Sequence, residues 1–278
     1  MYESYWHLNE KPFKNTSDPR FLCSFSQYSD TLMKLTYTVR ENMGAAMLTG
    51  VFGCGKTFIA RTLADSLSSR YVFAYLSSPP SSGVEFLRAL VRTMKSAELP
   101  SRKTELMEDA LLELLQMQLT DNNREGKDTV VVVDEAHAIE DERVFEKMRL
   151  LLNFQTREKF LLTLILIGQP ELAGKVANLR QLEQRIAIKC HLDPLSSEET
   201  REYIIQRLKV AGREEAIFQE SVFELIYKAT GGIPRRVNHL CDACLMTGFA
   251  RKKDTVDEEI FRESGKIFGG KIFPEEKF

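Results

Sequence analysis

The sequence predicts an α/β protein with a five-stranded parallel sheet between helices, followed by a small domain made only of helices. Three observations predict this class. From Gly44 onward, short apolar runs alternate with stretches of helical periodicity, as expected for strands joined by crossover helices. Four consecutive valines at 130–133 are typical of a strand buried on both faces of a parallel sheet. After Pro194 only helical patterns remain.

The expected elements divide the 278 residues into four parts. An N-terminal arm and helix (1–43) precede the sheet domain (44–193), a helical lid domain (194–268) and a tail (269–278). The expected strands cover 45–49, 71–76, 129–133, 160–167 and 186–190, and the expected helices between them cover 57–68, 84–95, 104–120 and 142–153.

The N-terminal arm contains two proline-broken aromatic pieces, at 11–13 and 18–21, which predict a segment laid over a domain. An amphipathic helix is expected over Ser29–Arg40. The arm would close a nucleotide pocket or simply pack its aromatic side chains, and the sequence favours neither interpretation.

A phosphate-binding pattern, G-x-x-x-x-G-K-[ST], lies between the first strand and the first crossover helix, the context that this motif requires. Glycines let a backbone turn its N–H groups toward phosphate, Lys56 supplies a point charge, and Thr57 supplies a hydroxyl ligand for Mg²⁺. The sequence therefore predicts an ATP site with Mg²⁺, formed by Gly50, Gly53, Cys54, Gly55, Lys56, Thr57 and Phe58.

Two carboxylates follow the four-valine strand, at the end of a parallel strand where α/β sheets bind ligands. We expect Asp134 to hold Mg²⁺ and Glu135 to orient the attacking water; the alternative is a polar strand end that caps the next helix. The letters D-E-A-H over 134–137 also occur in helicases. Such a helicase needs a second nucleotide-binding lobe, and the roughly 80 residues after Pro194 are too few for one.

Three further polar residues are candidates for contact with the γ-phosphate. Gln169 follows the next strand, so its amide would sense the γ-phosphate or hold the lytic water, unless it is a simple exposed turn residue. Arg185, with Arg180 as the second choice, precedes the last strand and would reach the site of a neighbouring subunit. Arg235 opens a lid helix, where its charge opposes the helix dipole; a role over the phosphates and simple solvation are equally compatible with this.

The composition excludes several classes of protein. A net charge of −2 gives no global attraction to nucleic acid or to anionic lipid. There is no secretory signal at the N-terminus and no apolar run that would insert into a membrane, so we expect a cytoplasmic chain, peripheral to the inner membrane only through a partner. Cys241 and Cys244 form one C-x-x-C; we expect buried helix cysteines there and not a zinc site, which needs more ligands.

The order of these motifs resembles that of the AAA+ ATPases. In both, a phosphate loop is followed by an Asp-Glu pair after an apolar strand, by a polar residue after the next strand, by an arginine before the last strand, and by a helical lid that contains Gly-x-Pro-Arg. The arm motifs, the stretch G-Q-P-E-L at 168–172 and L-D-P-L-S at 192–196 are similar to those of the ExeA/GspA group, ATPases associated with type II secretion.

This resemblance implies a fold, an activity and partners. It implies a P-loop NTPase fold of the AAA+ type and ATP hydrolysis, with Gln169 as sensor 1, Arg185 as an intersubunit finger and Arg235 as sensor 2. It also implies assembly into homo-oligomeric rings or filaments. Members of the group that assemble secretons usually continue into a membrane helix and a peptidoglycan-binding domain. Neither follows in this sequence, so we expect either that an envelope partner contacts the ATPase domain itself or that the context is different, as for related stand-alone ATPases of pilus, exopolysaccharide and protein-sorting systems.

Two functional hypotheses follow. In the first, ATP turnover drives the assembly or remodelling of a secretion or cell-envelope machine. In the second, an ATP-loaded oligomer coats DNA, as transposition target selectors and helicase loaders do. The near-neutral charge makes DNA the less favoured partner. A nucleotide switch that rarely turns over is a third, weaker hypothesis.

Overall fold

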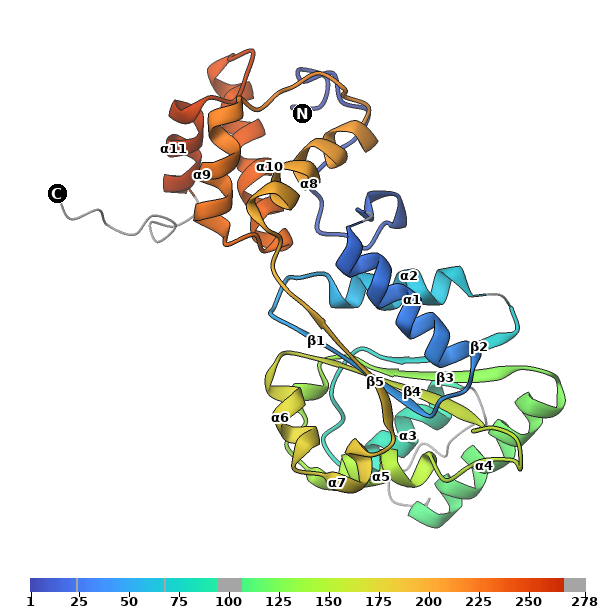
Figure 1. Cartoon of the computed structure of the whole chain (residues 1–278). Coiled ribbons are helices and arrows are strands. Elements are labelled where there is room, and N and C mark those ends of the chain that lie inside the picture. The colour runs from blue at the N-terminus through green and yellow to red at the C-terminus, as the bar shows by residue number, and fades with distance from the viewer. Residues whose placement is uncertain (24, 68, 95–106, 268–278) are drawn as a thin grey trace. The chain divides into compact units, whose positions relative to one another are not determined.

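The computed structural model describes residues 1–23, 25–67, 69–94 and 107–267 (Figure 1). These form two compact units. The sheet unit comprises Ser26–Phe52 and Lys56–Leu192, and the helical unit comprises Met1–Phe25, Gly53–Gly55 and Asp193–Phe278. The predicted tail (269–278) and the facing ends of the helices expected over 84–95 and 104–120 lie outside the described residues.

The sheet unit contains five parallel strands in the order β2-β3-β4-β1-β5. The predicted fold class is therefore confirmed, and every predicted strand forms within two residues of its expected bounds. The strands are β1 (Ala45–Gly50), β2 (Tyr71–Leu76), β3 (Asp128–Val133), β4 (Leu162–Gly168) and β5 (Ile186–Leu192).

Helices cover both faces of this sheet (Figure 1). On one face, α1 contacts β1, β5 and α2, and α2 contacts β1 and β4. The opposite face carries α3, α4 and α5, together with the short α6 and α7. The bounds are α1 (Ser26–Arg40), α2 (Lys56–Ser66), α3 (Gly83–Thr93), α4 (Glu108–Arg124), α5 (Glu142–Leu151), α6 (Glu171–Ala177) and α7 (Arg180–Glu183).

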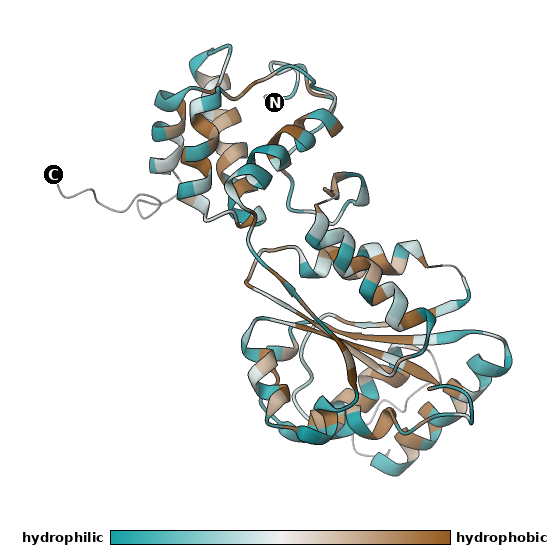
Figure 2. Cartoon of the chain, viewed as in Figure 1, coloured by the Kyte–Doolittle hydropathy of each residue, from teal (hydrophilic) through white to brown (hydrophobic). Residues whose placement is uncertain are grey.

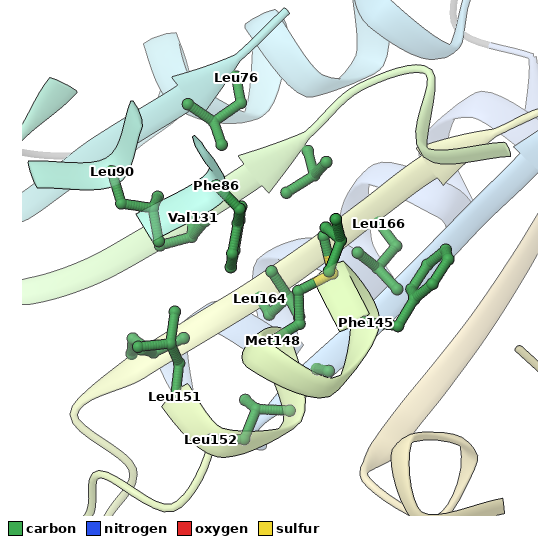
Figure 3. Packing of buried hydrophobic residues seen from close by; sticks show 14 of the residues in the cluster. Leu76, Phe86, Leu90, Val131, Phe145, Met148, Leu151, Leu152, Leu164 and Leu166 are labelled. Carbon is green, nitrogen blue, oxygen red and sulfur yellow. The ribbon is translucent and has the colours of Figure 1, made fainter. Parts of the chain in front are cut away.

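The central strands are buried on both faces, as the valine run predicts. Val131 and Val133 join a cluster with residues from α3 and α5, including Phe86 and Met148 (Figure 3). The valines that alternate with them, at 130 and 132, are equally inaccessible to solvent. The strands are accordingly among the most apolar segments of the unit (Figure 2). This double burial fixes the strand ends that carry the site.

The helical unit contains α8 (Ser197–Val210), α9 (Glu220–Thr230), α10 (Pro234–Arg251) and α11 (Glu258–Ile267). Helix α8 begins with a capping box, in which Ser196 and Glu199 satisfy each other's backbone N–H groups. Pro234 occupies the first turn of α10, a position that tolerates proline. Cys241 and Cys244 are buried in that helix, which confirms the expectation of helix cysteines. No helix of the described residues is long and apolar enough to cross a membrane.

The N-terminal residues pack within the helical unit. Arg207 of α8, only 5% exposed, donates to the carbonyls of Pro12 (2.6 Å) and Lys14 (2.8 Å) and lies 4.7 Å from the ring centre of Phe21. Trp6 fits against α10 at Gly248, where a Cβ would lie 2.8 Å from the indole. The arm is thus laid over a domain, as predicted, and that domain is the helical one.

Candidate functional site

The sheet register brings three predicted motifs to one edge. β1, β3 and β4 are parallel neighbours, and Thr49 is in register with Gly168, while Val133 is in register with Leu166. The phosphate loop, Asp134 with Glu135, and Gln169 each follow one of these strands directly. The edge therefore combines a glycine-rich loop, carboxylates and an amide, which is the arrangement that the sequence predicts.

The phosphate loop requires glycine near both of its ends. At its start, Gly50 lies in register with Leu192, and a Cβ on Gly50 would be 2.7 Å from the Leu192 carbonyl oxygen. Further on, Gly53 and Gly55 both adopt φ of +92°, a conformation that residues with a Cβ resist. Cys54 between them is buried, and Phe58 in the first turn of α2 is partly exposed. Helix α2 begins directly after the loop, so its positive end is available to an anion.

Lys56 is held against the loop that precedes it. Its side chain is 6% exposed, and its ammonium donates to the carbonyl oxygens of Gly50 (2.7 Å) and Val51 (3.0 Å). A buried ammonium at a helix start, beside a glycine-rich turn, concentrates positive charge where phosphate oxygens would bind. These residues fit the triphosphate of ATP.

Thr57 and Asp134 meet across two elements. The Thr57 hydroxyl donates to Oδ2 of Asp134 at 2.8 Å, and the Asp134 side chain is almost completely buried. Carboxylate and hydroxyl oxygens are the ligands that Mg²⁺ prefers, so this pair fits the ion. Sequence reasoning missed Tyr75 of β2, whose hydroxyl donates to the same Oδ2 at 2.6 Å. Burial, with the Asp134 hydrogen bond, raises the pKa of Tyr75, which therefore stays a donor.

Glu135 has an unusual backbone conformation for a residue with a Cβ. Its φ of +54° and ψ of +30° are left-handed, and the short 3₁₀ helix η2 (Ala136–Ala138) follows it. Its N–H donates to Oδ1 of Asp134 at 2.9 Å, which fixes the turn. A strained backbone at a strand end is a common feature of functional sites, because the surroundings must enforce it. The carboxylate itself is 38% exposed and so accessible to water.

Gln169 and Glu135 are connected through His137, to which sequence reasoning gave no role. The Nε2 atoms of Gln169 and His137 lie 2.9 Å apart, and Nδ1 of the same histidine lies 3.4 Å from Oε2 of Glu135. Only the structure could identify this residue, because the contact joins the ends of two different strands.

The structure places Arg185 away from the loop. It precedes β5, and Ile186 is in register with Ala45, the first residue of β1, whereas the loop follows the last. Six strand residues separate the two ends, about 20 Å. The guanidinium donates to the Leu152 carbonyl (3.0 Å) and to Oδ1 of Asn153 (2.7 Å). Arg185 therefore does not reach the site of its own subunit.

Arg180 and Arg235 lie in two further places. Arg180 lines a cavity of about 620 Å³ between α5 and the segment around α7, together with Arg143 and Arg149. Arg235 is exposed at the start of α10 in the helical unit, and its backbone N–H donates to the carbonyl of Gly53 (3.3 Å), which belongs to the same unit.

Comparison with known proteins gives one family and several relatives. A family profile for an AAA domain matches residues 39–176. The chain is 37% identical over 254 residues to general secretion pathway protein A of Aeromonas hydrophila, a match that covers 90% of this chain. It spans 45% of the length of that relative.

Three solved structures illustrate the similarity of this fold to known ones. The ORC2 protein of Aeropyrum pernix, solved in ADPNP and ADP complexes, is 17% identical, with a TM-score of 0.70 over 94% of this chain and 72% of that one. Cdc6p of Pyrobaculum aerophilum is 18% identical, with a TM-score of 0.69 over 90% of this chain and 70% of that chain. The RuvB Holliday junction branch migration motor of Thermotoga maritima is 19% identical, with a TM-score of 0.55 over 92% and 73%.

Proposed function

The chain belongs to the AAA+ ATPases, in the ExeA/GspA-like group, and from this membership we propose that it hydrolyses Mg²⁺-bound ATP and uses the cycle to assemble or remodel a secretion or cell-envelope machine. The membership supports nucleotide binding and an association with secretion. Hydrolysis, self-assembly and the identity of the machine are the proposed parts.

The meeting of Thr57, Asp134 and Lys56 at one sheet edge carries the proposal. Lys56 would neutralise the charge of the β- and γ-phosphates, and the loop glycines would let backbone N–H groups approach them. Thr57 and Asp134 would hold Mg²⁺, directly or through water. When bound, Mg²⁺ supplies charge neutralisation across the phosphate oxygens.

Glu135 and Gln169 would carry out the water chemistry. The exposed carboxylate of Glu135 would accept a hydrogen bond from the attacking water and orient it toward the γ-phosphorus. The Gln169 amide would donate to the water or to a γ-phosphate oxygen. Both residues follow strands that adjoin in the sheet, which supports a shared task.

Arg185 would act on the nucleotide of a neighbouring subunit, and this is the reason to propose self-assembly. Its position at the opposite ends of the strands argues against a role at its own site. A guanidinium supplied in trans stabilises charge on the γ-phosphate in the transition state. Arg235 of the helical unit would contribute a second guanidinium over the phosphates. The proposed location is the cytoplasm, with the inner membrane reached through a partner.

The DNA-coating hypothesis is not favoured. A related structure is the Aeropyrum pernix ORC1 protein in complex with DNA, but it is 17% identical and so shares only the fold. The 37% identical relative is by name a secretion protein. A net charge of −2 likewise provides no excess of cations for a phosphate backbone.

The test is the ATPase rate against protein concentration, with and without duplex DNA, while light scattering follows particle size. We expect a rate per subunit that rises as particles grow and that DNA does not change. Glu135→Gln should retain ATP binding but hydrolyse at least about a hundredfold more slowly. Arg185→Ala should bind ATP without turnover, and mixing it with Glu135→Gln should restore part of the rate. Turnover only with DNA would favour the coating hypothesis, and no rescue at any ratio would exclude the trans finger.

A further inference from the structure

His137 is the link between the two groups assigned to water chemistry. It lies in η2, three residues after Asp134, and its ring is 17% exposed. Nε2 of the ring faces the Gln169 amide nitrogen at 2.9 Å, and Nδ1 faces the Glu135 carboxylate at 3.4 Å. Within the described residues, Nδ1 is buried and has no hydrogen-bond partner. Buried polar atoms are nearly always paired, so this one indicates a partner that a small rotation would supply.

The ring is held firmly in this position by its backbone. Lys175 of α6 donates to the carbonyl oxygens of His137 (2.6 Å) and Ile139 (2.7 Å). On the β4 side, Gly168 permits close approach, since a Cβ there would lie 3.1 Å from the backbone nitrogen of His137. The 3₁₀ turn is thus fixed to the strand and to the helix on either side of Gln169.

The contacts select one tautomer of the ring. When the Gln169 amide N–H donates to Nε2, the ring proton lies on Nδ1 and points at the Glu135 carboxylate. The opposite tautomer would turn the Nδ1 lone pair toward a carboxylate oxygen at 3.4 Å, which is repulsive. A rotation of the partly exposed carboxylate then completes a chain from Gln169 through His137 to Glu135.

We propose that His137 is a positioning residue that holds Glu135 through Nδ1 and Gln169 through Nε2, so that these two groups act as one unit during hydrolysis. The proposal rests on the proposed function, in which Glu135 orients water. His137 itself contacts neither the water nor the phosphate. Its contribution is to fix the carboxylate, because an orienting group must be held close to its productive geometry.

The first test is a double-mutant cycle on turnover. His137→Ala should lower kcat at least about tenfold while KM and the Kd for ATP change less than about twofold, because the phosphate contacts remain. Gln169→Ala combined with His137→Ala should be no slower than the slower single variant, whereas independent residues would multiply their losses. His137→Gln can replace only Nε2 and His137→Asn only Nδ1, so neither should recover the wild-type kcat. His239→Ala, an exposed histidine of the helical unit, is the matched control and should leave turnover unchanged.

A second test does not depend on hydrolysis. The chain holds four histidines, so ¹⁵N-histidine labelling with His137→Ala assigns the ring signals directly. We expect the Nδ1-protonated tautomer at His137 and a changed Nε2 signal in Gln169→Ala. A ring protonated on Nε2, unaffected by Gln169→Ala, would overturn the proposal even in a protein without turnover.

The outcomes separate the two proposals. If the wild type hydrolyses ATP and Glu135→Gln loses turnover while His137→Ala keeps the wild-type kcat, the role of His137 is refuted and the proposed function stands. If His137→Ala and Gln169→Ala reduce kcat independently, the coupling is refuted. If the wild type shows no turnover at any concentration, the proposed function fails and the tautomer measurement alone decides on His137.

Discussion

Gly50→Ala should damage both the stability of the sheet and its affinity for ATP. Gly50 ends β1 in register with Leu192, and an added Cβ would lie 2.7 Å from the Leu192 carbonyl oxygen and 3.2 Å from its Cβ. Reaching ordinary contact requires the two backbones to separate by about 0.7 Å. Overpacking of this kind costs about 1–3 kcal/mol in free energy of unfolding.

The same displacement moves the loop. The Gly50 carbonyl accepts a hydrogen bond from Lys56, so a shift of the strand end also shifts the acceptor that holds the ammonium. Because misplacements of about 1 Å cost roughly a hundredfold in function, we expect the Kd for ATP to rise at least about tenfold.

Thermal unfolding and nucleotide titration measure the two effects. At about 2–4 °C per kcal/mol, Tm should fall by about 2–12 °C. Gly174→Ala in α6 is the matched control, because a Cβ there meets nothing within 4 Å. That change should leave the Kd for ATP unaltered and raise stability by up to about 1 kcal/mol, since alanine favours a helix. A Gly50→Ala protein with the wild-type Tm and Kd would refute the reasoning.

Three further predictions concern separate parts of the chain. Lys56→Ala should abolish ATP binding, because the buried ammonium supplies the loop's point charge, and unchanged affinity in a titration would exclude the phosphate-loop assignment. Arg207→Met should cost about 3–5 kcal/mol in free energy of unfolding, measured by chemical denaturation, because it leaves the buried carbonyl of Pro12 and the partly buried carbonyl of Lys14 without their donor. Arg201→Met in the same helix, where the arginine is half-exposed, should cost less than about 1 kcal/mol, and equal losses in the two variants would contradict this reasoning. Burial raises the pKa of the Cys244 thiol to about 12, so a thiol reagent at pH 8 should label it only at the rate of unfolding, and fast labelling of the folded protein would show that the thiol is accessible. Between about pH 9 and pH 12 this thiol ionises in the unfolded state but not in the folded state, so the free energy of unfolding should fall as pH rises through this range.

The sequence is sufficient to predict the parts of this fold that depend on local patterns. The valine run identifies β3 because a strand buried on both faces must be apolar throughout. The loop and α2 follow from a motif whose residues are adjacent in the chain. The capping box of α8 and the proline of α10 are equally local signals.

Contacts between distant residues could not be predicted. Tyr75 and Asp134 are 59 positions apart, and only the pairing of β2 with β3 makes the tyrosine a neighbour of the carboxylate. His137 is the last residue of the D-E-A-H motif, but its contact with Gln169 depends on the pairing of β3 with β4. The roles of the site residues, Arg185 and Arg235 included, stay predictions until the variants are measured.

Helix α11 lies within the predicted helical lid, but no local motif marks its bounds. Its sequence, Glu258–Ile267, begins with two glutamates and follows the charged residues at 251–254. The helix is fixed by burial of Ile260 and Phe261 within the helical unit and by contacts with α10. Tertiary packing, more than local preference, therefore determines this element.

The helical unit combines residues that precede the sheet unit in the sequence with residues that follow it, so the two groups leave the ribosome at different times. The arm up to Phe25 must wait for Asp193 and the residues after it, about 170 positions later. At about 5–20 residues per second, translation takes roughly 10–30 s to supply the partner helices. During that interval Trp6, Phe13 and Phe21, all buried in the folded chain, lack the later residues Leu245, Phe218 and Arg207 that they contact there. The arm is thus a candidate for chaperone binding at the ribosome while the sheet is already able to fold.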